Sequence, residues 1–251
     1  MPRALITGAT AGLGAEFARQ LAAKGYDLVL VARDVARLDA ARDALSAAHG
    51  VSVDTIPADL TTQDGCTAAA APMATIDVLI NNAGFGTYQA FGEADLDFEE
   101  RQLDLNVRAV LRLTHAAMPL MKQRGHGVII NVSSVAGFVP RGGNVTYSAS
   151  KAWVTMFSEA LAVQLAGSGV TVTAVCPGFT HTEFHERAHA DMSSVPGRMW
   201  LDAATVVSEG LADAFAGKPI SVPSRRYKAL VGAVRAMPRP VLRAVMARRG
   251  L

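Results

Sequence analysis

The two residues with the clearest chemical potential are Tyr147 and Lys151, four positions apart in Tyr-Ser-Ala-Ser-Lys. On a helix, residues at this spacing lie one turn apart on the same face. A tyrosine hydroxyl is a poor acid or base at neutral pH, because its ordinary pKa is about 10. A neighbouring ammonium favours the phenolate and brings that pKa nearer the working range. The pair therefore predicts general acid–base chemistry, with an ordinary surface pair as the alternative.

Other polar residues close apolar, strand-like runs. Asn81–Gly84 follows one run, and Asn131–Ser134 ends another, thirteen residues before the tyrosine. In an open parallel sheet, ligands sit outside the carboxyl ends of the strands. Ser133 and Ser134 both compete for a substrate contact there, and the thirteen-residue offset favours Ser134. Asn106 lies between apolar neighbours in a helical stretch, which indicates a structural or solvent-binding role.

A glycine-rich turn, Thr7–Gly14, lies between the first apolar run and the first helical stretch. Glycines let the backbone approach a pyrophosphate, and the helix N-terminus supplies free N–H groups and a positive dipole end. The spacing G-x-x-x-G-x-G departs from the G-x-G-x-x-G dinucleotide fingerprint. Its position directly after a strand favours dinucleotide binding all the same.

The end of the second apolar run indicates which dinucleotide. An NAD-preferring site places a carboxylate there for the ribose 2′-hydroxyl, and that carboxylate would repel a 2′-phosphate. Ala32 holds this position here, and the adjacent Arg33 has the chemistry to pair with a phosphate. We therefore predict NADP(H). The alternative is that Arg33 is a solvated loop residue and Asp34 faces the ribose.

These residues need a scaffold, and seven short runs supply it. Most are apolar without alternation, as expected for strands buried on both faces of a parallel sheet. The runs are Ala4–Thr7, Asp27–Ala32, Ser52–Pro57, Val78–Asn81, Gly127–Val132, Val170–Val175 and Ile220–Val222. Helical spacing is found in Ala15–Lys24, Val35–Ala48, Phe98–Met121, Ala149–Ala166 and Ala203–Ala216. The alternation predicts an α/β fold: a single doubly wound, Rossmann-type domain with a seven-stranded parallel sheet.

Composition narrows the class further. Of the 251 residues, 50% are hydrophobic and 18% are charged, which is typical of a globular chain. Cys66 and Cys176 lie far apart in no zinc-type spacing, so we expect a reducing cytoplasmic setting, with Cys176 as buried packing. The apolar run at Ala4–Thr7 leaves no room for a signal peptide before it. No apolar stretch reaches the roughly 18–20 residues of a membrane-spanning helix.

Taken together, the motifs resemble the short-chain dehydrogenase/reductase family. They cover residues 4 to about 182 in the family's order and spacing, and jointly they are highly specific. The matching pieces are Thr7–Gly14, Asp59-Leu60, Asn81–Gly84, Asn106, Ser134, Tyr147 with Lys151, and Pro177-Gly178 followed by Thr182.

The resemblance implies a catalytic set of Asn106, Ser134, Tyr147 and Lys151. Tyr147 would act as general acid in reduction and as base in oxidation. Lys151 would lower the pKa of Tyr147 and hold the nicotinamide ribose. Ser134 would hydrogen-bond the substrate oxygen, and Asn106 would support a water that relays protons to Lys151.

The resemblance also implies the cofactor contacts. Asp59 and Leu60 would flank the adenine, and Asn82–Gly84 would line the adenosine side. Thr180 and Thr182 would secure the nicotinamide end. The full set that we predict to bind the cofactor is Gly8, Gly12, Leu13, Gly14, Arg33, Asp59, Leu60, Asn82, Ala83, Gly84, Tyr147, Lys151, Pro177, Gly178, Thr180 and Thr182.

In this family the substrate lid follows the sixth strand, here at about residues 179–201. An apolar pocket and simple packing of the lid are both consistent with its aromatic content. The candidate pocket residues are Phe184, Met192, Met199 and Trp200, with Phe138, Val139 and Pro140 opposite. His181, His185 and His189 recur every four residues, yet the family's chemistry needs no metal, and we predict none.

Residues 224–251 form a basic extension beyond a catalytic domain of residues 1–223. From Ala214 onward there are nine Lys or Arg and no acid, so the rest of the chain sums to +2 − 9 = −7. Apolar stripes run through Tyr227–Val234 and Val241–Met246. The extension either packs on the domain or a dimer partner, or lies on anionic lipid as an interfacial helix. Nucleic-acid binding is not expected, because no reading motif is present.

We therefore predict a cytoplasmic oxidoreductase that moves a hydride between NADP(H) and a carbonyl or secondary alcohol. The expected substrate is an apolar, lipid-like ketone or 3-oxoacyl compound. By family resemblance we expect a homodimer or homotetramer, with peripheral membrane contact through the extension as an alternative. A catalytically weak NADP(H)-sensing protein is the competing function, and the intact catalytic set argues against it.

Overall fold

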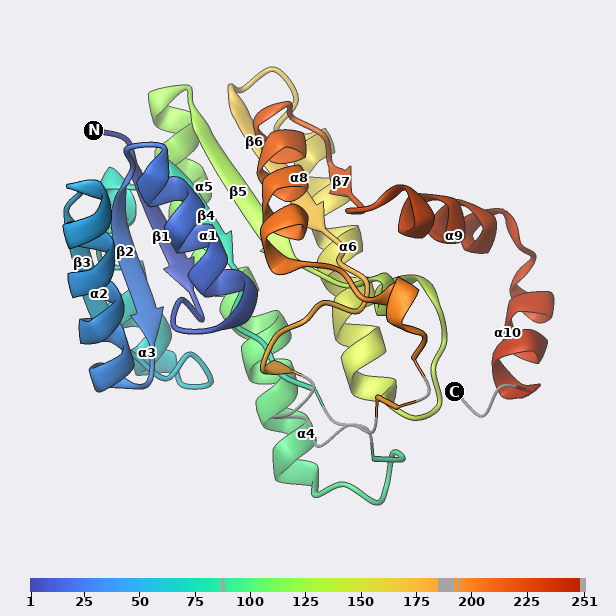
Figure 1. The fold of residues 1–251 in the computed structure, drawn as a ribbon. Coiled ribbons are helices and arrows are strands. Elements are labelled where there is room, and N and C mark those ends of the chain that lie inside the picture. Colours follow the sequence, from blue (N-terminus) through green and yellow to red (C-terminus); the bar gives the residue numbers. More distant parts are fainter. Residues whose placement is uncertain (87–88, 185–191, 194, 249–251) are drawn as a thin grey trace.

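The computed structural model describes residues 1–86, 89–184, 192–193 and 195–248, arranged around a seven-stranded sheet (Figure 1). The strands are β1 (Arg3–Thr7), β2 (Asp27–Ala32), β3 (Val53–Pro57), β4 (Val78–Asn81), β5 (Gly127–Val132), β6 (Val170–Val175) and β7 (Ile220–Ser221). Their order is β3-β2-β1-β4-β5-β6-β7, with every neighbouring pair parallel. The predicted Rossmann-type fold is confirmed. The strand order reverses at β1, which places the expected ligand site at the carboxyl ends of β1 and β4.

Helices cover both faces of the sheet. The longer ones are α1 (Gly12–Ala23), α2 (Val35–His49), α3 (Gln63–Ala70), α4 (Leu96–Leu103), α5 (Val110–Arg124), α6 (Val145–Gln164), α8 (Ala203–Phe215), α9 (Arg225–Ala236) and α10 (Arg239–Arg248). Short turns are η1 (Met73–Thr75), η2 (Asp104–Ala109), η3 (Val135–Phe138) and η4 (Gly197–Met199). α1, α2 and α8 pack on one face, and α3, α5 and α6 pack on the other. α9 and α10 follow β7 and extend to one side of the sheet (Figure 1).

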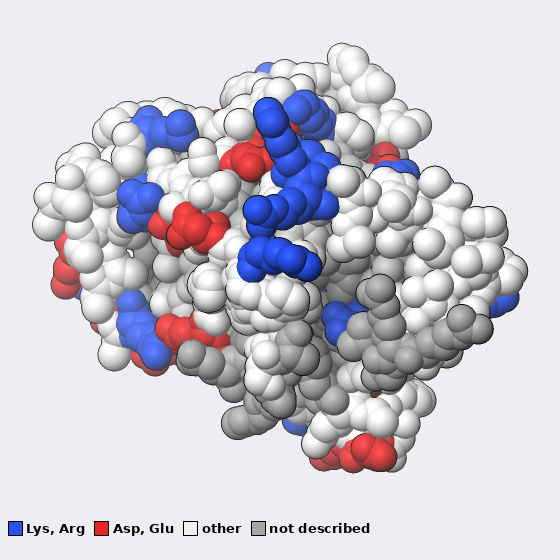
Figure 2. All heavy atoms as spheres, turned by 45° about the vertical axis from the view of Figure 1, so that its right-hand side comes forward, with Lys and Arg blue, Asp and Glu red and all other residues white. Residues whose placement is uncertain are grey.

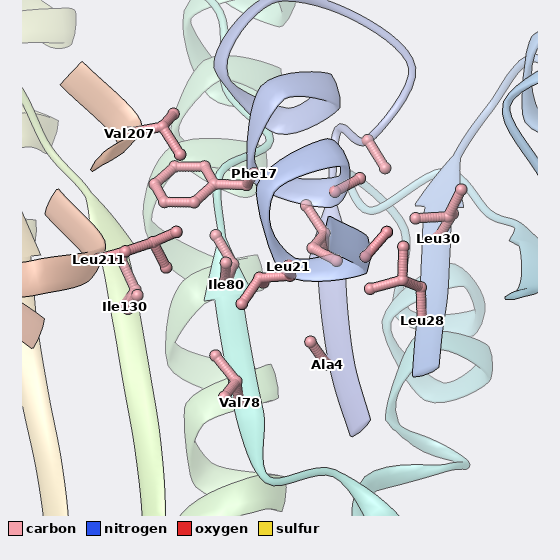
Figure 3. Packing of buried hydrophobic residues seen from close by; sticks show 14 of the residues in the cluster. Ala4, Phe17, Leu21, Leu28, Leu30, Val78, Ile80, Ile130, Val207 and Leu211 are labelled. Atoms are coloured by element: carbon pink, nitrogen blue, oxygen red, sulfur yellow. The ribbon is translucent and has the colours of Figure 1, made fainter. Parts of the chain in front are cut away.

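The core on the α1 face forms around Phe17, whose side chain is fully buried. Figure 3 shows Phe17 between Val207 and Leu211 of α8 and Ile80 of β4. Alternate residues of each strand serve opposite faces, so Leu5 of β1 belongs to the other apolar cluster. This explains why the strand sequences are apolar throughout and do not alternate.

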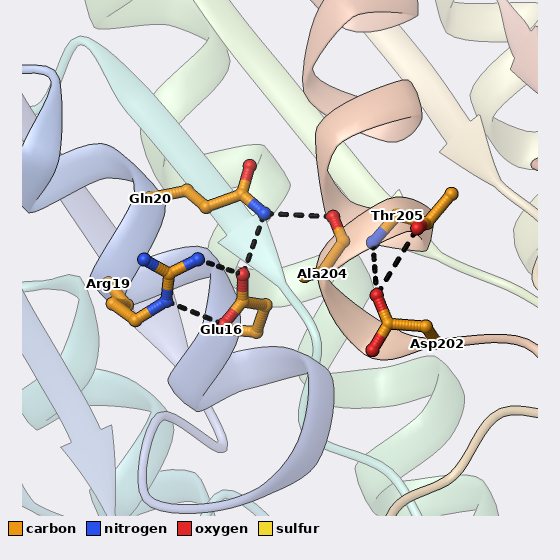
Figure 4. A network of polar contacts seen from close by, with 6 residues as sticks. All are labelled: Glu16, Arg19, Gln20, Asp202, Ala204 and Thr205. Atoms are coloured by element: carbon orange, nitrogen blue, oxygen red, sulfur yellow. Dashed lines mark hydrogen bonds and ion pairs between the residues drawn. The ribbon is translucent and has the colours of Figure 1, made fainter.

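Polar contacts join α1 to the start of α8, directly after the lid segment (Figure 4). The Gln20 amide donates to the backbone oxygen of Ala204 (2.9 Å) and to Glu16 (2.7 Å). A hydrogen bond from Arg19 is the main reason that the pKa of Glu16 is lowered. Asp202 caps α8 by accepting from the backbone N–H of Thr205 (2.9 Å). The end of the lid segment is therefore anchored on the rigid domain.

The chain is helical from Leu96 to Arg124, as the helical spacing of Phe98–Met121 predicted. A π-helical turn, η2, separates α4 from α5. Asn106 lies in that turn, and its amide group makes hydrogen bonds to the backbone of Phe85 outside the helix. A π-turn accommodates one extra residue, and such turns are frequent at functional sites. The helical spacing is therefore confirmed, and the π-turn within it is a feature that the spacing did not indicate.

The basic extension contacts the domain through α9. Tyr227 is 2% exposed and Val231 is buried beside it. Three of the four bases of this helix contact the body of the protein: Arg226 donates to the backbone oxygen of Arg198 (2.7 Å), Lys228 pairs with Glu209 (3.2 Å) and Arg235 with Glu159 (3.8 Å). Figure 2 shows Lys and Arg side chains gathered on this face, some beside acidic side chains. These contacts favour the packing alternative.

Within the described ranges, no helix has the length and apolar character needed to cross a bilayer. The division of the chain at residue 224 stays a prediction.

We expect Phe17→Ala to lower the free energy of unfolding by about 3–5 kcal/mol, because it opens a cavity between α1, α8 and the sheet. Urea unfolding followed by circular dichroism measures the change. Phe91→Ala is the matched control, since Phe91 is 65% exposed, and we expect a change below about 0.5 kcal/mol. Equal effects of the two substitutions would contradict this account of the core.

Candidate active site

A single cavity of about 1480 Å³ runs from the glycine-rich turn to α9 and α10. It is lined by every residue predicted to be catalytic or cofactor-binding, except Gly14 and Asn106. Pockets for one small ligand usually measure about 300–1,000 Å³. The cavity is therefore large enough for a cofactor and a second molecule.

The glycine-rich turn adopts a shape that only glycine tolerates well. Gly8 and Gly12 have φ angles of +64° and +52°, in the left-handed region. A Cβ atom on Gly14 would collide with the backbone oxygen of Gly8, which explains the need for glycine at a position away from the cavity wall. A Cβ on Gly12 would come within 3.1 Å of Thr182, so the base of the lid segment lies directly against the turn.

Thr7 and Asn82 hold this turn against the end of β4. The hydroxyl of Thr7 accepts hydrogen bonds from the backbone N–H groups of Asn82 (2.9 Å) and Ala83 (3.0 Å). The Asn82 amide donates to the backbone oxygens of Thr7 (2.9 Å) and Gly8 (3.3 Å). The Asn82 side chain thus positions the turn, a role that the sequence pattern did not indicate.

Tyr147 and Lys151 lie together on α6 at the cavity wall, as their spacing predicted. The Lys151 ammonium is 5.7 Å from the centroid of the Tyr147 ring and donates to the backbone oxygen of Val132 (2.7 Å). Burial lowers the pKa of Lys151 to about 8. The Tyr147 ring packs so closely on Gly86 that a Cβ there would be 2.8 Å from the ring. The phenol is therefore held beside a buried ammonium.

The two serines at the end of β5 have different surroundings. Ser133 is 3% exposed, and its hydroxyl donates to the backbone oxygen of Lys151 (2.8 Å). The Ser134 hydroxyl accepts from the N–H of Ala136 (3.1 Å) and donates to no residue within the described part of the chain. Ser134 can therefore donate a hydrogen bond into the cavity, while Ser133 supports the backbone under Lys151.

Asn106 lies behind the cavity wall and is fully buried. Its side-chain oxygen accepts from the N–H of Phe85 (3.1 Å), and its amide donates to the oxygen of Phe85 (2.8 Å) and to Ser150 (3.3 Å). A Cβ on Gly84 would be 2.9 Å from that side-chain oxygen and 3.5 Å from the Lys151 ammonium. These contacts place Asn106 as a support for the loop after β4. Its role in a proton relay stays a prediction.

The residues considered for the choice between NADP(H) and NAD(H) line the cavity near the end of β2. Arg33 is exposed, lines the cavity and makes no ion pair with the described residues. Asp34 caps α2 by accepting from the N–H of Arg37 (3.0 Å), so part of its carboxylate is already engaged. Arg37 also lines the cavity and pairs with Glu183 of the lid segment (3.2 Å). The sequence reasoning missed Arg37, which lies one helical turn beyond Arg33.

The apolar residues expected around the substrate are only partly at the cavity. Phe138, Val139, Phe184 and Met199 line it, whereas Pro140, Met192 and Trp200 do not. Trp200 instead stacks on His181, with ring centroids 4.7 Å apart. His185 and His189 lie outside the described residues, and the described residues contain no cluster of metal-binding side chains.

The sequence reasoning also missed that the C-terminal helices line the cavity. Val231 and Val234 of α9 and Val245 and Met246 of α10 are on its wall. The apolar stripes were visible in the sequence, but which surface they cover depends on the path of the chain after β7.

Cys176 lies close to the site but is buried packing, as predicted. It is fully buried, and burial raises its pKa to about 11. Cys66 is also buried, and its pKa is raised for the same reason. Both are free thiols of low reactivity.

Comparison with known proteins gives matches over most of the chain. A family model described as short chain dehydrogenase matches residues 2–193. A short-chain dehydrogenase from Sphingobium yanoikuyae, solved in complex with NADPH, is 38% identical, with a TM-score of 0.86 over 94% of each chain. A bulky-bulky ketone specific alcohol dehydrogenase from Comamonas testosteroni is 32% identical, with a TM-score of 0.81 over 95% of this chain and 96% of that one. A ketoacyl reductase from Nostoc is 37% identical over 179 residues, which are 70% of this chain and 62% of the relative.

Replacing Lys151 by Met should stabilise the fold at neutral pH, because the buried charge is removed while the side-chain volume is kept. The pKa of Lys151 in the folded state, about 8, lies below its usual 10.5, so burying the ammonium costs stability. That cost is complete below pH 8 and disappears as the pH rises to 10.5. We expect a gain of about 1–3 kcal/mol at pH 7 that shrinks by pH 10.

Urea unfolding at the two pH values measures this difference. Lys122→Met is the control, because Lys122 is an exposed lysine on α5. We expect it to change the unfolding free energy little at either pH. A Lys151→Met gain that is as large at pH 10 as at pH 7 would rule out burial of the ammonium as its cause.

Proposed function

The chain belongs to the short chain dehydrogenase family, and from this premise we propose that it is an oxidoreductase transferring a hydride between NADP(H) and a carbonyl or secondary alcohol. The observation that carries the proposal is one continuous cavity, with the glycine-rich turn at one part of its wall and Ser134, Tyr147 and Lys151 at another. A dinucleotide held by the turn has its reactive end within the same cavity as the acid–base residues.

The cofactor is NADP(H). The close-packed glycine turn suits a pyrophosphate, and Arg33, which forms an ion pair with none of the described residues, offers a guanidinium at the end of β2 for the 2′-phosphate. The 38% identical neighbour from Sphingobium yanoikuyae, described as a complex with NADPH, supports this assignment. When bound, NADPH supplies the hydride.

The residues of this chain handle the proton. In reduction, Ser134 donates a hydrogen bond to the carbonyl oxygen, which fixes the substrate and withdraws charge from its carbon. Tyr147 gives its phenolic proton to that oxygen as the C–O π bond is lost, and the Lys151 ammonium stabilises the resulting phenolate. Oxidation of the alcohol reverses each step. The 5.7 Å separation of the ammonium from the Tyr147 ring supports this division of roles.

The substrate is an apolar ketone or 3-oxoacyl compound. The side chains Phe138, Val139, Phe184 and Met199 present apolar surface beside the acid–base residues. The names of two relatives agree with this class: one is specific for bulky-bulky ketones and the other is a ketoacyl reductase. Assembly as a homodimer or homotetramer and a cytoplasmic location stay predictions.

We expect Tyr147→Phe to lower kcat/KM for a ketone by about 10²–10⁴-fold, because the proton donor is lost. NADPH affinity, measured by cofactor fluorescence, should change little. Tyr26→Phe is the control, since Tyr26 stacks on Phe215 and does not line the cavity. Full turnover by the Tyr147→Phe enzyme would sink this assignment. If wild-type protein binds NADPH tightly but turns over no carbonyl compound, the sensing function is favoured instead.

We expect Arg33→Ala to weaken NADPH binding by about 10–100-fold and to leave NADH binding almost unchanged, because only NADPH carries the 2′-phosphate. Fluorescence titration of the protein with each cofactor measures both affinities. Arg42→Ala is the control on the following helix, α2, where Arg42 pairs with Asp39 and Asp43. Tighter binding of NADH than NADPH by wild-type protein would overturn the cofactor assignment.

A further inference from the structure

The cavity continues beyond the acid–base residues into the two C-terminal helices. Tyr147 and Lys151 line it, and so do six aliphatic residues of α9, α10 and the turn between them: Leu230, Val234, Met237, Leu242, Val245 and Met246. The part of the cavity that these six residues line is called the C-terminal arm below. A total volume of about 1480 Å³ is larger than one ligand needs, so the arm offers space outside the cofactor site.

The lid segment contacts both the reacting residues and the start of α9. The Tyr147 ring lies 5.7 Å from the ring of Phe184 in the lid segment. At the base of α9, the Tyr227 hydroxyl donates to the backbone oxygen of Met199 (2.8 Å) and accepts from the N–H of Phe179 (3.1 Å). Its ring packs so closely on Gly178 that a Cβ there would collide with it. α9 therefore begins against Gly178, Phe179 and Met199, which line the same cavity as the reacting residues, and the arm extends from this fixed base.

The arm is apolar because the charges of α9 point elsewhere. Arg226, Lys228 and Arg235 contact Arg198, Glu209 and Glu159 on the body of the protein, and none of the three bases lines the cavity. No acid occurs in residues 214–251. A charged or strongly hydrated group placed in the arm would lose its water without gaining a partner. An aliphatic group has no hydrogen bonds to water to lose, and burial of its surface is favourable.

The side chains of the arm suit a chain more than a rigid ring. All six are aliphatic or thioether groups, and methionines such as Met237 and Met246 adapt their shape to what they contact. Building on the function proposed above, we propose that the C-terminal arm binds a long aliphatic substituent of the ketone, so that α9 and α10 set the chain length of the substrate.

The length of the alkyl chain therefore determines kcat/KM for a ketone. Each methylene that enters the arm should raise kcat/KM about fourfold, until the arm is filled. The test uses NADPH and 2-alkanones of increasing length with the full chain. The double variant Val234→Thr and Val245→Thr keeps the shape of both side chains and adds two hydroxyls. We expect it to lower kcat/KM for the long ketones by about tenfold and to leave the short ones unchanged.

Val241→Thr is the matched control, because Val241 is on α10, 50% exposed and not on the cavity wall. It should leave the whole series unchanged. Turnover that does not depend on chain length in the wild-type enzyme overturns the proposal while leaving the oxidoreductase function standing. Equal losses in the control and the double variant overturn it as well.

Calorimetric binding of the corresponding 2-alkanols to the protein with NADP⁺ separates the two proposals when no turnover is found. Affinity that rises with chain length and falls in the double variant supports the C-terminal arm, even if the oxidoreductase function fails. Affinity that is independent of chain length overturns the inference.

Discussion

Much of the site is arranged around a buried ammonium. Lys151 is 5% exposed, and its hydrogen bond to the Val132 backbone oxygen only partly replaces the water that it loses. The neighbouring backbone is packed to hold it there: Ser133 binds the Lys151 carbonyl, and a Cβ on Gly137 would come within 2.8 Å of the Lys151–Ala152 backbone. Burial of the Lys151 ammonium lowers the stability of the fold. It places a positive charge beside the Tyr147 phenol in a largely apolar cavity.

Backbone segments also pack closely around the acid–base pair at two glycines. Gly84 lies against Asn106 and the Lys151 ammonium, and Gly86 lies against the Tyr147 ring. Asn106 lies in the π-turn η2 and hydrogen-bonds the backbone of Phe85 from there. The π-turn, the two glycines and the buried Asn106 amide thus act together. They allow the loops after β4 and β5 to pack directly against Tyr147 and Lys151.

The sequence was most informative where local chemistry decides the structure. Short apolar runs without alternation are typical of strands buried on both faces, and the spacing of Tyr147 and Lys151 holds on any helix. Prediction from the sequence failed where residues that are far apart in the chain contact each other. Helix α3 is not among the helical stretches named from the sequence, and its Gly65 is explained only by a distant contact, because a Cβ there would collide with the Asp59 backbone. The partner of Arg37 is 146 positions away, and no local pattern indicates it.

The position of Tyr227 has a consequence for how the substrate range of this protein can change during evolution. The Tyr227 hydroxyl joins both ends of the lid segment to α9, so the start of the C-terminal helices is fixed on the catalytic domain. Beyond that start, residues of the C-terminal arm can change without disturbing the sheet, the glycine-rich turn or the acid–base pair. New substrates are then reachable through substitutions in the last twenty or so residues, while the chemistry is inherited intact.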